Sequence, residues 1–193
     1  DVGNPRYSFL AGKKMQKFVQ TLFGCKQFSD CEIPLSVVTT DLANGQEVVI
    51  NQGSIAKAVL ASIAIPGLLP PVQYGNRYLV DGGSSNVTPA SVLVKTPSKI
   101  IIAVDVSVPP AARFLNKPTL FTTLVQAYTI IRDQSIKYQL SQAEVKHKSL
   151  IIVRPVFDDI IDTFQFNQVP DFIALGEAAM RHSLPTIKRA LVK

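Results

Sequence analysis

The chain has 193 residues, of which 47% are hydrophobic and 18% are charged. This composition is typical of one folded globular domain over 1–193 and excludes an intrinsically disordered chain. The 20 basic and 14 acidic residues give a formal net charge of +6, which favours peripheral contact with an anionic membrane surface. The basic residues are scattered and are not interleaved with aromatic residues, so no nucleic-acid partner is expected.

The sequence predicts no metal site at its cysteines or at its cluster of aspartates. Cys25 and Cys31 have no neighbouring His or Cys that would complete a ligand set, although a disulfide between them remains open. Asp158, Asp159 and Asp162 lie in an apolar frame and fit a solvated turn better than a metal cluster. The chain starts without a signal peptide, and no apolar run is long enough to span a bilayer. A cytoplasmic or peripheral membrane location is therefore favoured, and the absence of an initial Met predicts a fragment or a processed product.

The first half of the chain predicts two helices and three strands. Apolar residues at helical spacing predict an amphipathic helix over Lys13–Phe23 and a buried helix over Ile55–Ala64, for which Ser54 is a good N-cap. β-branched runs predict strands at 33–40 and 47–51, and the Asn44-Gly45 turn would join them as a hairpin. After a stiff proline-rich linker at 68–72, a turn at 75–76 leads into a short strand, Tyr78 to Val80.

The second half predicts further strands and long helices. Pro89–Val94 fits a short turn or helix, and the continuous apolar run 100–106 predicts a strand with both faces covered, hence a parallel sheet in an α/β structure. Helical spacing over 119–146 predicts one long helix or two in sequence, and 150–153 a further strand. The last predicted helix is 171–191, in which Pro185 should force a break or a kink.

Asp81 stands where the Tyr78 to Val80 strand breaks into two glycines, Gly82 and Gly83. A glycine pair can take positive φ or let another group approach the backbone closely. One interpretation is a tight Asp-Gly turn with no further role. The other is a strand that presents an acidic side chain at the edge of a sheet for chemistry.

A set of motifs in a fixed order favours the second interpretation. The motifs are Val37-Val38-Thr39-Thr40-Asp41-Leu42 with Asn44-Gly45, Ser54 to Val59, Ala61-Ser62 with Ile65-Pro66-Gly67, Leu79 to Gly83 with Asn86, and the strand Ile101 to Val106. Together they resemble the patatin-like phospholipase family over 1–106, whereas 107–193 is a variable helical region with one further strand.

The resemblance implies a fold, an activity and a site. It implies part of a three-layer α/β fold with a mainly parallel central sheet, and a lipid acyl hydrolase that uses a Ser–Asp dyad without a metal or a diffusible cofactor. The dyad aspartate of the family lies in an Asp-Gly-Gly or Asp-Gly-Ala turn, which assigns that role to Asp81. Gly82, Gly83, Pro66 and Gly67 are then expected to contact the lipid or ester substrate.

The nucleophilic serine is the missing part of this dyad. The family carries it in a Gly-x-Ser-x-Gly elbow, and residues 1–193 contain no such motif. Ser84 and Ser85 fit turn residues better than nucleophiles. We therefore expect the serine to come from a missing N-terminal segment or a second chain, and a homo-oligomer is one such arrangement. The alternative is a catalytically inert binding or assembly module derived from the same fold.

Overall fold

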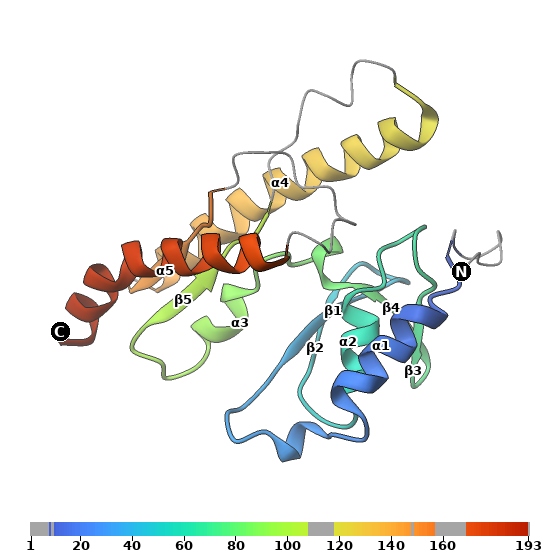
Figure 1. The fold of residues 1–193 in the computed structure, drawn as a ribbon, viewed down its shortest axis with the longest axis horizontal. Coiled ribbons are helices and arrows are strands. Elements are labelled where there is room, and N and C mark those ends of the chain that lie inside the picture. The colour runs from blue at the N-terminus through green and yellow to red at the C-terminus, as the bar shows by residue number, and fades with distance from the viewer. Residues whose placement is uncertain (1–7, 9, 108–117, 148, 157–168, 193) are drawn as a thin grey trace. The chain divides into compact units, whose positions relative to one another are not determined.

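The structure is a computed structural model that describes residues 8, 10–107, 118–147, 149–156 and 169–192 (Figure 1). The predicted turn with Asp158, Asp159 and Asp162 lies outside these residues. The chain divides into two compact units, 1–87 and 88–193. The single domain expected over 1–193 remains a prediction.

The first unit is built on a four-stranded antiparallel sheet with the order β2-β1-β4-β3. Its strands are β1 (Val37–Asp41), β2 (Glu47–Ile50), β3 (Val72–Tyr74) and β4 (Arg77–Asp81), and its helical elements are α1 (Lys13–Phe23), α2 (Ile55–Ser62) and two short 3-10 helices, η1 (Phe28–Asp30) and η2 (Gly82–Ser84). The predicted hairpin over β1 and β2 is confirmed, with Val38 opposite Val49. The same sheet places Thr39 of β1 opposite Asp81 of β4.

Helix α2 forms the buried layer on this sheet, as its apolar sequence predicts. Ala58 and Ala61 are fully buried, and these small side chains let the helix approach β1 and β4 closely. The Ser54 hydroxyl caps the helix by accepting a hydrogen bond from the Lys57 amide at 3.3 Å. At the other end, the Ser62 hydroxyl donates to the Val38 carbonyl at 2.8 Å. The core around α2 also contains Phe28, Ile50, Ile55 and Leu79.

The described residues of the second unit form a two-stranded parallel sheet and three helices. Its elements are α3 (Ala90–Val94), β5 (Ile101–Val104), α4 (Leu120–Lys146), β6 (Leu150–Val153) and α5 (Val169–Val192). Ile101 and Ala103 of β5 are buried, but Ile102 and Val104 are exposed. In the part of the chain that the structure describes, β5 therefore has one covered face, where its continuous apolar sequence predicted two.

The α/β fold class is confirmed, and the direction of strand pairing differs from the expectation. Parallel pairing holds for β5 and β6, whereas all three pairings in the four-stranded sheet are antiparallel. Short turns explain two of these pairings, β1 with β2 and β3 with β4, because tight links such as Gly75-Asn76 can join only antiparallel neighbours. The region 119–146 is one helix, α4. Helix α5 continues through Pro185, so the break, one of the two outcomes predicted there, does not occur, and the kink stays a prediction.

Candidate functional site

Asp81 is the last residue of the central strand β4 and the N-cap of η2. Its backbone amide donates to the Ala64 carbonyl at 3.0 Å, just beyond the C-terminal end of α2. Its Oδ1 atom accepts a hydrogen bond from the Gly83 amide at 2.6 Å. Strand, helix and turn thus fix both the backbone and the half-buried carboxylate of Asp81.

Gly82 is glycine because of close packing, and its φ is not positive. A Cβ atom at this position would lie 2.4 Å from the Val38 carbonyl oxygen and 2.9 Å from the Val38 carbonyl carbon. Both atoms belong to the backbone of β1, which is held between β2 and β4 and has little freedom to move. A glycine here could provide either a positive φ or room for another group to approach closely, and Gly82 provides room for the backbone of β1.

Hydroxyl groups fasten the Asp81 turn to strand β1. The Thr40 hydroxyl donates to the Asp81 carbonyl at 2.9 Å and lies 2.8 Å from the Ser85 hydroxyl. The Ser85 hydroxyl also donates to the Gly82 carbonyl at 3.4 Å, and Ser84 is exposed. Ser85 thus makes the bonds of a turn residue. Thr40 lies in one of the motifs that carry the resemblance, but nothing in the sequence indicated this contact, because Thr40 lies 41 positions from Asp81.

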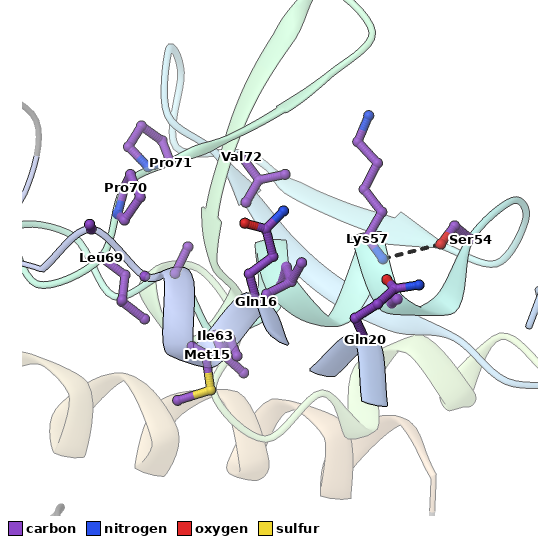
Figure 2. Close-up of a pocket in the computed structure, with 15 residues that line it drawn as sticks. Met15, Gln16, Gln20, Ser54, Lys57, Ile63, Leu69, Pro70, Pro71 and Val72 are labelled. Atoms are coloured by element: carbon purple, nitrogen blue, oxygen red, sulfur yellow. Dashed lines mark hydrogen bonds between the residues drawn. The ribbon is translucent and has the colours of Figure 1, made fainter. Parts of the chain in front are cut away.

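An open hollow of about 370 Å³ lies between α1, α2 and the segment 69–72 (Figure 2). Its apolar lining includes Met15, Leu60, Ile63, Leu69, Pro70, Pro71 and Val72. Ala64, whose carbonyl accepts the Asp81 amide, also lines it. Pro66 and Gly67, two of the predicted substrate contacts, form an exposed turn before this lining, and Gly67 has a φ of 81°.

An ion pair between the buried Asp105 and the exposed Arg154 lies at the carboxyl ends of the two parallel strands in the second unit. Arg154 Nε donates to Asp105 Oδ2 at 2.8 Å, and the Ser107 amide donates to Asp105 Oδ1 at 3.1 Å. Burial by itself would raise the pKa of Asp105, but the hydrogen bonds from Ser107 and Arg154 outweigh it and hold the pKa below its usual value. Asp105 is thereby committed to its ionised form at neutral pH.

Within the described residues, no three His, Cys, Asp or Glu side chains cluster as metal ligands would. No helix in the same residues is both long and apolar enough to cross a bilayer.

The fold and the turn define a class of protein: a mixed α/β chain in which a central strand ends on an aspartate, followed by a glycine packed on the neighbouring strand. The patatin-like phospholipase family profile matches residues 5–94, which contain this entire arrangement. In this segment, which is just under half of the chain, the protein is similar to the patatin-like phospholipase family.

Relatives with the same segment are found in bacteria, fungi and animals. An uncharacterized NTE family protein of Mycobacterium tuberculosis is 36% identical over 101 residues, which are 52% of this chain and 17% of that protein. Lysophospholipase NTE1 of Debaryomyces hansenii is 31% identical over 106 residues, 55% of this chain and 7% of the relative. Mouse patatin-like phospholipase domain-containing protein 7 is 31% identical over 108 residues, which are 55% of this chain and 8% of that protein. The chain thus spans less than a fifth of the length of each of these relatives.

Proposed function

We propose that the protein is a lipid acyl hydrolase that cleaves carboxylic ester bonds of phospholipids, lysophospholipids or acylglycerols. The observation that carries the proposal is the Asp81 turn, which presents an oriented carboxylate at a strand end within the segment that matches the family. The name lysophospholipase, carried by the relative from Debaryomyces hansenii, supports a lipid ester as substrate.

In this proposal Asp81 is the carboxylate of a Ser–Asp dyad. A serine hydroxyl is a weak nucleophile until a neighbouring group accepts its proton. The serine oxygen would attack the ester carbonyl, its proton would pass to Asp81, and the leaving alcohol would take that proton as an acyl-serine forms. Water would then release the fatty acid by the same steps in reverse. A carboxylate is a weak base at neutral pH, so the fixed orientation given by the Gly83 amide supports this role.

The serine of the dyad would be supplied from outside residues 1–193, by another segment or a second chain. Residues 1–193 contain no Gly-x-Ser-x-Gly motif, and the Ser85 hydroxyl already holds the turn through Thr40 and Gly82. Gly82, Gly83, Pro66 and Gly67 remain predicted substrate contacts.

The decisive experiment compares two aspartates that have similar local geometry. Asp81→Asn in the natural full-length protein keeps an oxygen that can accept the Gly83 amide but removes the base. We expect release of fatty acid from a short-chain ester to fall by at least about 100-fold, the lower range for losing general-base catalysis. The control is Asp41→Asn, because Asp41 Oδ1 also accepts an amide two residues on, from Ala43 at 3.0 Å. An Asp81→Asn variant with activity near that of wild type would contradict the proposal.

The absence of the serine motif favours one second candidate, an inert binding or assembly module. A fluorophosphonate probe attaches covalently to activated serines and separates the two. Labelling of a serine in the natural full-length protein that is lost in Asp81→Asn supports the hydrolase, whereas no labelling of the natural full-length protein supports the inert module.

A further inference from the structure

The hollow between α1 and α2 has a polarity that points to a particular kind of ligand. Most of its described lining residues are apolar, and a single one, Lys57, has an ionisable side chain. Figure 2 shows Lys57 extending away from Met15 and Ile63, so the cation lies apart from these two apolar side chains. We infer that this hollow binds a long-chain carboxylate, with the alkyl chain on the apolar lining and the carboxylate at Lys57.

The exposed side chain of Lys57 contacts the ring of Tyr74 in the same unit. The Lys57 ammonium lies 5.0 Å from the centre of the Tyr74 ring, a distance at which a cation and an aromatic face attract each other. The Tyr74 hydroxyl in turn donates to the Gln52 carbonyl at 3.2 Å, and β3 pairs with β4 beside it. A contact that favours one orientation of the ammonium before the ligand arrives reduces the entropy lost on binding.

The local electrostatics favour an anion over a neutral or cationic head group. Lys57 stands in the first turn of α2, where the helix dipole adds positive potential. Ser54, Gln16 and Gln20 complete the polar part of the described lining, and none of them is acidic. A single lysine matches the single charge of a carboxylate, whereas a phosphate dianion usually gathers several cations or amide donors.

The size of the hollow matches one alkyl chain. Its volume of about 370 Å³ lies near the lower end of the 300 to 1,000 Å³ of typical small-ligand sites. Each methylene group that leaves water strengthens binding by roughly fourfold. Affinity should therefore rise with chain length from octanoate to laurate by about fourfold per carbon until the hollow is full.

The first test is calorimetric titration of the natural full-length protein with laurate below its micelle concentration. We expect saturable binding of laurate, no measurable binding of acetate, and at least tenfold weaker binding of dodecyltrimethylammonium, which has the same chain and the opposite charge. Equal affinity for the two amphiphiles would overturn the inference.

The second test uses variants that separate this hollow from general surface charge. Lys57→Gln should weaken laurate binding at least tenfold, and Lys57→Arg should retain most of it. Lys26→Gln is the matched control, because Lys26 is another exposed lysine of the same unit outside the lining. Thermal unfolding should confirm that all three variants fold. If Lys57→Gln binds like wild type, or if Lys26→Gln weakens binding equally, the inference is wrong.

The binding site does not depend on the proposed hydrolysis, and one variant keeps the two apart. Asp81→Asn should bind laurate with wild-type affinity whatever its effect on ester cleavage. Amide NMR shifts on laurate binding should centre on the first turn of α2 and on residues 69–72. Saturable binding whose shifts fall elsewhere would refute the assignment to this hollow.

Discussion

Gly82→Ala tests whether the Asp81 turn depends on the contact between Gly82 and strand β1. The added Cβ would start 2.4 Å from the Val38 oxygen, so turn and strand must separate by about 1 Å before the distance reaches 3.4 Å, where ordinary contact begins. The Val38 carbonyl also accepts the Ser62 hydroxyl, which further resists this movement. Overpacking of this kind costs about 1–3 kcal/mol of unfolding free energy.

Urea denaturation followed by circular dichroism measures this cost. With a urea dependence of about 1–3 kcal/mol per molar, the midpoint should fall by roughly 1 M. The control is Gly176→Ala in α5, where a Cβ meets nothing within 4 Å and φ is not positive. That change should raise stability by about 0.5–1 kcal/mol, since alanine favours a helix more than glycine does. A Gly82→Ala midpoint equal to wild type would show that the turn does not depend on this contact.

Two further stability predictions concern single side chains. Because the folded pKa of Asp105 lies below its ordinary value, its ionised form stabilises the fold at neutral pH, and this contribution is lost as pH falls through the folded pKa. Asp105→Asn should therefore lower the unfolding free energy by about 2 kcal/mol at pH 7. In urea titrations at stepped pH, the difference in unfolding free energy between wild type and variant should become smaller below pH 3.8. A difference that stays constant with pH would contradict the stabilising role of the ionised carboxylate. Ser54→Ala removes the N-cap of α2 and should lower the unfolding free energy by about 1 kcal/mol in the same urea titration at pH 7. An unchanged urea midpoint would show that the cap does not contribute to stability.

Elements with local end signals could be predicted closely from the sequence. The boundaries of α1 match the prediction because Gly12 and Gly24 stand at its two ends, and the Gly24 amide bonds the Gln20 carbonyl. Strand β1 was predicted from residue 33 but begins at Val37, and Ile33 is 80% exposed. Apolar composition identified the strand there and overestimated its length.

Features that depend on distant pairing could not be predicted. The direction of the sheet is set by which strands meet, and a run of β-branched residues fits parallel and antiparallel neighbours alike. The role of Thr40 likewise appears only when β1 pairs with β4, which brings its hydroxyl to the Asp81 carbonyl. Nothing in the sequence around Thr40 signals this bond.

The two glycines after Asp81 have different functions, although the sequence presents them as a pair. Gly82 must lack a side chain because the backbone of β1 occupies the space where Cβ would lie. Gly83 contributes its amide to Asp81 Oδ1, and every residue except proline carries that amide. This difference gives a physical reason why an Asp-Gly-Gly turn and an Asp-Gly-Ala turn can present the same carboxylate. The first glycine sets how closely the turn packs on the sheet, and the second amide sets how the carboxylate points.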